Sequence, residues 1–252
     1  MQTCQSIVLV TPVWNDSKRL AVFAPELGAA INDSNLPILW VVADDGSNAS
    51  ERLKYEEITD YVRTLGCQVD TIRLKDRSFK GGIIYEAWNN YPQADWLAFV
   101  DADGAVSAKS ILDLIYLARE KGEDACVVAV RSDQEKPVRR SYIRRCSCYL
   151  FKRLVQFILG LELGDTQCGA KVISGLAYRN FASQLRESGY VFDVELLVLL
   201  NINEVNLLHY TVEWDEKARG KINLLRDGWS MLIGLLRIRR RLRSGTYNPL
   251  KS

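Results

Sequence analysis

The stretch Trp96-Leu97-Ala98-Phe99-Val100 runs directly into Asp101-Ala102-Asp103. Five apolar residues in succession predict a short strand that is buried on both faces, because a strand with one solvent-exposed face alternates polar and apolar residues. The acidic tripeptide then ends the strand and places two carboxylates two residues apart. Such a pair can hold a divalent cation, although a solvated turn explains the same three residues.

Strands and helices alternate on both sides of this stretch. We expect strands at residues 6–13, 37–43, 68–74, 95–100 and 126–130, and helices at residues 19–31, 51–65, 80–89 and 108–121. This order predicts an α/β fold with a mainly parallel sheet that helices cover on both sides. Ligands bind such sheets beyond the carboxyl ends of the strands. Five aspartates follow strand ends and should share one rim: Asp16, Asp44, Asp45, Asp101 and Asp103.

The pattern changes in the second half of the chain. A basic segment at residues 133–153 leads into helical spacing, and a compact loop or short strand follows at residues 164–175. Further helical patterns precede a last strand at residues 206–214, and a basic, largely helical tail follows from residue 217.

The composition is that of an ordinary globular protein, with 48% hydrophobic and 25% charged residues, which excludes a disordered or disulfide-framed chain. The longest apolar runs are far shorter than the ~20 residues that span a bilayer. The N-terminus enters a strand pattern at once, so we expect no signal peptide and a protein on the cytoplasmic side of the membrane. The six cysteines form no Cys-x-x-Cys pair and His209 is the single histidine, so we expect reduced, buried thiols rather than a zinc site.

A net charge of +2 conceals two unequal halves. Residues 1–125 contain 12 Lys and Arg against 19 Asp and Glu, whereas residues 126–252 contain 21 against 12. Solvated charges placed by chance are one explanation. The other is that the second half meets an anion, which would be a phosphate, a nucleic acid or a membrane surface.

Two more motifs lie where expected elements end or begin. Asp44-Asp45-Gly46-Ser47 follows the second expected strand. A carboxylate there can accept a hydrogen bond from a nucleobase, but a plain turn with a helix cap explains the motif as well. Lys80-Gly81-Gly82 opens a helix, and the free N–H groups of a helix start favour phosphate.

The motifs carry more information together than singly. Four segments follow one another along the N-terminal half: Thr11-Pro12-Val13-Trp14-Asn15-Asp16, Val41-Val42-Ala43-Asp44-Asp45-Gly46-Ser47, Lys80-Gly81-Gly82 and Phe99-Val100-Asp101-Ala102-Asp103. In this order and spacing the chain resembles the inverting glycosyltransferases of family 2, which have a Rossmann-like GT-A fold. The resemblance implies one GT-A domain over residues 1–216, with a nucleotide-sugar half (1–105) and an acceptor half (106–216).

The resemblance also implies roles for individual residues. Pro12, Trp14 and Asp16 would cradle the base and ribose, although Asp16 is one methylene shorter than the Glu usual in the family. The nucleotide-sugar site would be completed by Asp44, Asp45, Lys80, Asp101, Ala102 and Asp103, with Asp45 the main partner of the base. Asp101 and Asp103 would bind Mg²⁺ or Mn²⁺ on the diphosphate, and Asp103 would be the catalytic metal ligand.

The C-terminal half is similar to the branch of the family that glycosylates dolichyl or polyprenyl phosphate, above all to the dolichyl-phosphate glucosyltransferases. The similarity lies in residues 140–144, 165–171, 192–197 and 212–221. Ala170 stands where that branch usually has Phe, and Gly220-Lys221 lacks the Ser normally between them. Because of these two departures, the resemblance does not assign the acceptor contacts in these segments.

A phosphate acceptor would explain the arginines of the second half. A phosphomonoester is mostly a dianion near pH 7 and needs no general base to attack, but cations must bind it, and Arg does so with two donors. By resemblance we expect these contacts from Arg131, Arg140, Arg144 and Lys221, with a solvated basic face as the alternative. If the acceptor were a sugar hydroxyl, Asp165 would be the catalytic base; otherwise it would hold its loop through backbone N–H groups.

The tail from residue 217 to 252 contains an amphipathic pattern. On a helical projection the apolar side holds Leu225, Trp229, Leu232, Leu235 and Leu236, and the opposite side holds Arg226, Arg237, Arg240 and Arg241. Such a helix can lie on a membrane surface, or it can pack on the core with its charges in water. We expect residues 225–243 to contact a membrane.

The function expected from all this is metal-dependent, inverting transfer of a hexose to a polyprenyl or dolichyl phosphate, with UDP-glucose as the expected donor. The protein would be peripheral on the cytoplasmic face of a membrane. One alternative is a family 2 glycosyltransferase that acts on a hydroxyl of a saccharide or small molecule. A second is a non-enzymatic module that binds polyanions or membranes, but no nucleic-acid partner is expected because no aromatic stacking surface is evident.

Overall fold

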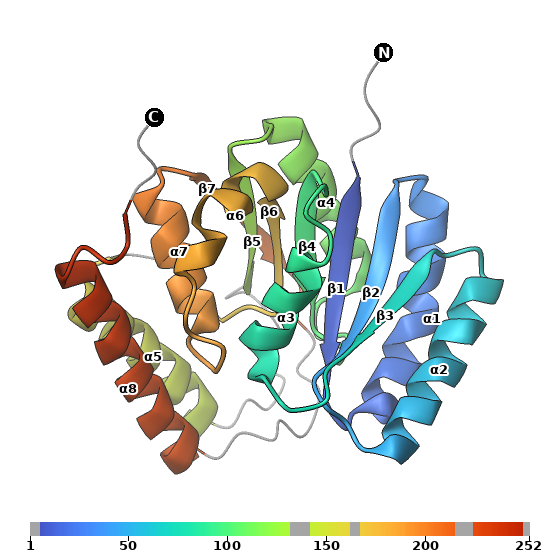
Figure 1. The fold of residues 1–252 in the computed structure, drawn as a ribbon, viewed down its shortest axis with the longest axis horizontal. Coiled ribbons are helices and arrows are strands. Elements are labelled where there is room, and N and C mark those ends of the chain that lie inside the picture. The colour runs from blue at the N-terminus through green and yellow to red at the C-terminus, as the bar shows by residue number, and fades with distance from the viewer. Residues whose placement is uncertain (1–5, 132–141, 162–166, 215–223, 249–252) are drawn as a thin grey trace.

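The computed structural model describes residues 6–131, 142–161, 167–214 and 224–248. Its strands are β1 Ile7–Val13, β2 Ile38–Asp44, β3 Val69–Arg73, β4 Trp96–Val100, β5 Ala125–Arg131, β6 Ala170–Ser174 and β7 Asn206–Val212. Its helices are α1 Ser17–Ser34, α2 Ala49–Thr64, α3 Phe79–Asn89, α4 Ala108–Lys121, α5 Tyr142–Leu159, α6 Gly175–Phe181, the 3-10 turn η1 Ala182–Gln184, α7 Phe192–Ile202 and α8 Leu224–Arg243. Within the described residues the strands form one sheet in the order β3-β2-β1-β4-β6-β5-β7 (Figure 1). The predicted α/β fold is confirmed.

The parallel part of the sheet brings strand ends together. β1 pairs in parallel with β2 on one side and with β4 on the other, with Ile7 opposite Ile38 and Trp96. The carboxyl ends of these three strands therefore lie at one edge, which is the lower edge in Figure 1. Because each strand is followed there by a polar turn, this edge collects the acidic motifs.

β6 departs from the parallel pattern. The sequence predicts a compact loop or a short strand at residues 164–175, and the structure has a short, fully buried strand there, Ala170–Ser174. It lies between β4 and β5 and is antiparallel to both, which the sequence did not predict. Ala170 lies opposite Val100, so the first residues of β6 meet the carboxyl end of β4. Two antiparallel steps leave β5 parallel to β4, and Arg131 therefore ends at the same edge as Asp101.

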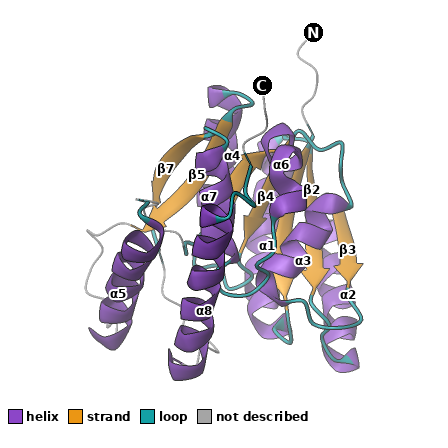
Figure 2. Cartoon of the chain, turned by 60° about the vertical axis from the view of Figure 1, so that its left-hand side comes forward, coloured by secondary structure: helices purple, strands orange, loops and turns teal. Residues whose placement is uncertain are grey.

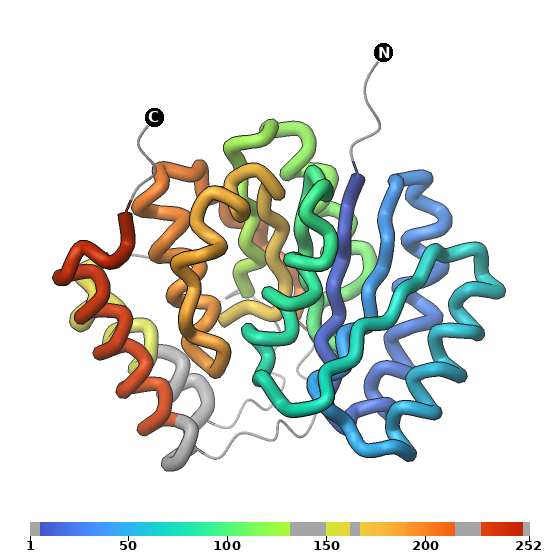
Figure 3. The backbone as a smooth tube through the Cα atoms, in the orientation of Figure 1, coloured from blue at the N-terminus to red at the C-terminus, as the bar shows by residue number. Residues whose placement is uncertain are grey.

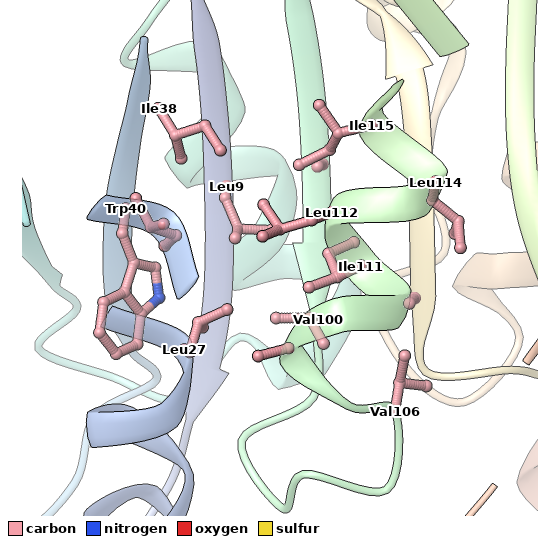
Figure 4. Close-up of a cluster of buried hydrophobic side chains, with 14 of the residues drawn as sticks. Leu9, Leu27, Ile38, Trp40, Val100, Val106, Ile111, Leu112, Leu114 and Ile115 are labelled. Carbon is pink, nitrogen blue, oxygen red and sulfur yellow. The ribbon is translucent and has the colours of Figure 1, made fainter. Parts of the chain in front are cut away.

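Helices cover both faces of the sheet, which explains why the central strand β4 is apolar throughout. Leu9 of β1 packs with Leu27 of α1 and Ile111 of α4 in one buried cluster (Figure 4). The next residue, Val10, belongs to a second cluster on the opposite face, which α3, α6 and α7 cover. Successive side chains of a strand point to opposite faces, so a sheet enclosed in this way leaves no position for a solvated residue.

α5 and α8 lie side by side at one end of the molecule (Figures 2 and 3). Leu235 and Ile238 of α8 are buried in the second cluster, as is Val155 of α5. The same two helices also turn apolar side chains to solvent, since Trp229 is 66% exposed and Phe157 is 83% exposed. Within the described residues, no helix is long and apolar enough to cross a membrane.

The expected division of α8 into two sides is wrong in two respects. Leu235 is fully buried while Leu236 is about half exposed, so the expected apolar side divides between the interior and solvent. Arg237 and Arg241 do not join the charged outer side either, because both bind Glu187 in the interior. A helical projection shows only which residues of one helix share a side and how polar they are. It cannot detect a buried carboxylate elsewhere in the chain that draws an arginine inward.

The thiols that the structure describes follow the expectation from composition. Cys67, Cys126 and Cys168 are free and buried. Burial raises the pKa of the Cys67 thiol to about 11 and that of Cys126 to about 12, so both thiols stay protonated at physiological pH.

Candidate active site

A cavity of about 230 Å³ opens at the carboxyl edge of the sheet, beside β1, β4 and the start of α3. Its lining comprises Pro12, Val13, Trp14, Asp16, Arg19, Asp45, Arg77, Lys80, Ile83, Asp101, Ala102 and Asp103. The structure therefore brings together all of the predicted nucleotide-sugar residues except Asp44. A larger cavity of about 640 Å³ lies at the opposite edge, but none of the described residues that line it is charged.

Asp101 is held from two directions at the end of β4. Its Oδ1 lies 2.6 Å from Nζ of Lys80, and its backbone N–H donates to the carbonyl of Gly169 at 2.9 Å. Burial alone would lower the pKa of Lys80, but the nearby carboxylates, led by Asp101, raise it above its ordinary value. Lys80 therefore remains a cation beside the cavity.

Asp103 and Asp16 share one cation. Arg19, in the first turn of α1, donates from Nε to Asp16 at 2.8 Å, forms a second, shorter contact with the same carboxylate, and lies 3.4 Å from Oδ2 of Asp103. Burial raises the pKa of Asp103, and the charge of Asp101 raises it further. A second cation close to Asp101 and Asp103 would relieve the repulsion between their negative charges.

Asp45 and Arg77 also line the cavity. The Oδ1 atom of Asp45 accepts hydrogen bonds from the backbone N–H and the hydroxyl of Ser78 at 2.6 and 3.0 Å, and burial raises the pKa of this carboxyl. The guanidinium of Arg77 lies 3.5 Å from the ring centroid of Trp14 and 4.9 Å from that of Phe79. Phe79 has a φ of 66°, which is a strained conformation for a bulky residue. The first residue of α3 is thus held in a strained conformation next to Lys80, which lines the cavity.

Asp44 stands apart from this group. Its side chain is almost fully buried, its Oδ1 accepts the backbone N–H of Ser47 at 2.9 Å, and its Oδ2 lies 3.4 Å from Nε of Arg52. Gly46 completes the turn with a φ of 74°, in the region that favours glycine. Asp44 therefore shapes the turn that carries Asp45, and it does not line the cavity.

A buried ion pair lies behind Asp101. Lys171 of β6 is fully buried, and its Nζ lies 2.6 Å from Oδ1 of Asp193 and 3.1 Å from the carbonyl of Cys168. Burial raises the pKa of Asp193, and the charge of Lys171 opposes that rise. The same lysine fixes the carbonyl next to Gly169, which contacts Asp101.

The residues at the cavity fit a hard divalent cation. Within the described parts of the chain, no group of three His, Cys, Asp or Glu side chains could hold a metal ion. Mg²⁺, however, commonly binds one or two carboxylates together with substrate phosphates, and carboxylates also suit Mn²⁺. Asp101 and Asp103 both line the cavity, so they are the residues that could hold such an ion.

The predicted acceptor residues are only partly described. Arg131 lies at the carboxyl end of β5, two strands from β4, so about 10 Å separates the two strand ends. Its guanidinium carbon lies 4.8 Å from the ring centroid of Trp214. Arg140, Asp165 and Lys221 lie outside the described residues, and the same holds for the side chain of Arg144.

Arg19 and Arg77 line the cavity, but the sequence patterns did not single them out. Arg77 follows the end of β3 closely, so the expectation that ligands bind beyond strand ends could have included it. Arg19 lies three residues after Asp16, a spacing at which opposite charges meet on a helix.

Comparison with known proteins agrees with this geometry. The profile of "Glycosyl transferase family 2" matches residues 9–179. Dolichyl-phosphate beta-glucosyltransferase of Saccharomyces cerevisiae is 26% identical over 259 aligned residues, covering 96% of this chain and 77% of the yeast protein. The Mus musculus protein of the same name is 28% identical, covering 96% and 78%.

Solved structures share the fold at lower identity. Mannosyl-3-phosphoglycerate synthase of Rubrobacter xylanophilus superposes with a TM-score of 0.65 at 17% identity, covering 98% of this chain and 77% of that one. Glucosyl-3-phosphoglycerate synthase of Mycobacterium tuberculosis, crystallised with Mn²⁺, uridine diphosphate and glucosyl-3-phosphoglycerate, gives a TM-score of 0.63 at 13% identity, covering 98% and 82%. Because the family profile covers more than half of the chain, the protein belongs to glycosyl transferase family 2 and is a glycosyltransferase.

Proposed function

We propose that this glycosyltransferase transfers glucose from UDP-glucose to dolichyl phosphate or a related polyprenyl phosphate. The observation that carries the proposal is the cavity in which four carboxylates and three cations meet at the carboxyl edge of the sheet. The relatives named dolichyl-phosphate beta-glucosyltransferase support the choice of acceptor. The structural neighbour that was crystallised with uridine diphosphate and Mn²⁺ supports the choice of donor and metal.

The donor would bind along the cavity from Asp45 to Asp103. Asp45 would accept a hydrogen bond from the base, which would lie beside Trp14 and Pro12, and Asp16 would bind the ribose. Lys80 and Arg19 supply positive charge for the diphosphate, because each already lies against an aspartate of the cavity.

Asp101 and Asp103 would hold Mg²⁺ or Mn²⁺ next to the diphosphate. Bound there, the ion supplies positive charge that neutralises the leaving diphosphate as its bond to the sugar breaks. Lys80 contributes in the same direction, since its cation lies 2.6 Å from Asp101. Lys80 and the bound ion would thus stabilise the negative charge that builds on the leaving diphosphate.

The acceptor phosphate would bind on the β5 side of the cavity. Arg131 lies at the same edge of the sheet as Asp101, and we propose it as an acceptor ligand together with Arg140, Arg144 and Lys221. A phosphate dianion attacks the anomeric carbon without giving up a proton, so no general base is required. Asp165 would then organise its loop.

The lipid part of the acceptor requires a membrane surface near the site. We propose that the face formed by α5 and α8 provides it, with Phe157, Trp229 and Leu236 entering the interface between headgroups and acyl chains. The exposed cations Lys152 and Arg243 lie on the same two helices and would meet anionic headgroups. The protein would then be peripheral on the cytoplasmic face, and residues 225–243 would supply only part of the contact.

Glucosyl transfer is tested by incubating the protein with labelled UDP-glucose, Mg²⁺ or Mn²⁺, and membranes that contain dolichyl or undecaprenyl phosphate. We expect label in the organic extract, its loss on chelation of the metal, and its loss in Asp103→Ala. No lipid-extractable sugar from any common nucleotide sugar would contradict the acceptor, and full activity of Asp103→Ala would contradict the metal role. Activity without lipid that is lost in Asp165→Asn would instead favour a hydroxyl acceptor.

Membrane binding is tested separately by co-sedimentation with vesicles that contain anionic phospholipid. Phe157→Ser and Trp229→Ser should weaken sedimentation. Val22→Ser is the matched control, because Val22 is 77% exposed on α1, remote from the α5–α8 face. Equal sedimentation of all three variants would contradict the proposed face.

A further inference from the structure

Two buried carboxylates connect α8 to the interior. Glu187 is 4% exposed and Glu195 is fully buried. Arg237 binds both oxygens of Glu187, at 2.9 and 2.5 Å. Arg241 reaches Glu187 at 2.7 Å and Glu195 at 3.0 Å, and the hydroxyl of Tyr247 also donates to Glu195. Both guanidinium groups therefore neutralise charges inside the protein.

The segment that precedes α7 depends on these two arginines. Burial opposes ionisation of Glu187, but Arg237 and Arg241 hold its pKa below the ordinary value. Glu195 in turn accepts the backbone N–H groups of Arg186 and Glu187 at 2.7 and 2.6 Å. A buried carboxylate without its cation is strongly unfavourable, so residues 185–188 keep this conformation only while α8 is in place.

The same segment contacts the first turn of α3. The carbonyl of Ser188 accepts the backbone N–H of Gly81 at 2.8 Å. The fit leaves no room for a side chain, since a Cβ on Gly81 would lie 2.6 Å from Cγ of Phe192 and 2.9 Å from the carbonyl oxygen of Ser188. A displacement of Ser188 would therefore displace the start of α3.

The first turn of α3 and the residue before it bind two carboxylates of the donor cavity. Lys80 binds Asp101 at 2.6 Å, and Ser78, directly before the helix, binds Asp45 through both its N–H and its hydroxyl. These contacts join the two ends of the cavity, because Asp45 follows β2 and Asp101 follows β4. An unbroken series of contacts thus runs from α8 through Glu187 and Ser188 to Lys80.

We propose that Arg237 and Arg241 are positioning residues for the nucleotide-sugar site, acting through residues 187–188 on the turn that holds Lys80. They touch neither donor nor acceptor. The inference rests on the proposed donor site. It adds that α8, whose outer side would face the membrane, fixes the geometry of the donor site through the arginines on its inner side.

The test compares charge removal on the two sides of α8. Arg237→Gln removes a positioning charge at a half-exposed side chain, whereas Arg240→Gln removes the same charge from an exposed position on the same helix. The dissociation constant for UDP with Mn²⁺ is measured by calorimetry in the absence of lipid, and thermal denaturation shows that each variant is folded. We expect Arg237→Gln to raise this constant about tenfold, within the range of couplings between distant sites, and Arg240→Gln to leave it unchanged.

Steady-state kinetics distinguish positioning from general destabilisation. Arg237→Gln and Arg241→Gln should raise KM for the sugar nucleotide and leave KM for the lipid acceptor unchanged, and Arg237→Lys should recover part of the loss. Unchanged UDP binding in folded Arg237→Gln would overturn the inference while leaving the proposed function intact, as would an equal effect of Arg240→Gln. If the unaltered protein bound no nucleoside diphosphate, the proposed function and the inference would both be overturned.

Discussion

Gly169→Ala is a direct test of the geometry around Asp101. Gly169 precedes β6, and its carbonyl accepts the backbone N–H of Asp101. A Cβ at this position would lie 2.9 Å from Cγ of Asp101 and closer still to Oδ2, whereas ordinary contacts begin near 3.4 Å. The backbone of Gly169 is not in the left-handed region, so alanine is compatible with it and the effect is purely steric.

The size of the effect follows from the displacement required. The carboxylate of Asp101 must move by about 0.5–1 Å, which lengthens its 2.6 Å contact with Lys80 and shifts one of the two proposed metal ligands. A misplacement of about 1 Å in a reacting assembly can reduce the rate about 100-fold, or about 2.7 kcal/mol of transition-state stabilisation. The cost in folding stability should be about 1–3 kcal/mol, as for other overpacked sites.

The assay is the initial rate of glucosyl transfer to dolichyl phosphate, together with the affinity for Mn²⁺ and UDP measured by calorimetry. Gly228→Ala is the control, because nothing lies within 4 Å of a Cβ at that position and both rate and affinity should stay unchanged. A Gly169→Ala variant that binds Mn²⁺ and UDP normally and turns over at the full rate would refute the role given to Asp101.

Three further predictions concern charge and burial. Glu51 accepts the backbone N–H of Ser17, which with Lys54 lowers its pKa from the ordinary 4.5 to about 2; the stabilisation is therefore complete above about pH 4.5 and is lost as the pH falls toward 2. Glu51→Gln should lower the free energy of unfolding by about 1–2 kcal/mol near pH 7 and by less near pH 3 in urea titrations, and a difference independent of pH would contradict this. Lys171→Met should cost about 3–5 kcal/mol in the same titrations because it leaves Asp193 unpaired, and adding Asp193→Leu should recover most of the loss, whereas additive losses would disprove the pairing. Cys67 and Cys126 should resist iodoacetamide in the native protein near pH 8 and react after unfolding, so rapid native modification in peptide mass spectrometry would count against their burial.

The strands and the acidic rim could be predicted from the sequence because both depend on local pattern. Apolar runs such as Trp96–Val100 indicate strands enclosed on both faces, and an Asp directly after such a run must lie at the edge where parallel strands end. The family resemblance is confirmed on the same segments. The prediction that Asp45, Asp101 and Asp103 would lie near one another depended only on strand direction, and the cavity contains all three.

The features that sequence patterns missed depend on partners distant in the chain. The sequence of a five-residue strand does not show the direction in which the strand runs, so the antiparallel insertion of β6 could not be anticipated. Nor does the polarity of Arg241 reveal that it faces Glu195, which lies 46 residues away. Local pattern does not distinguish Asp44 from Asp45, and only the family resemblance singled out Asp45. The structure shows Asp44 buried in the turn and Asp45 lining the cavity.

The direction of β6 determines how this enzyme can be divided. Asp101 and Gly169 are 68 residues apart in the chain, yet the N–H of Asp101 donates to the carbonyl of Gly169 because β6 enters the sheet beside the carboxyl end of β4. A fragment that stopped after β4 would leave that strand as an open edge, which is a template for aggregation. We therefore do not expect the chain up to β4 to fold as an independent module. A chimera that joins it to the C-terminal part of a relative should work only if the relative supplies a strand that pairs with β4 as Ala170 pairs with Val100.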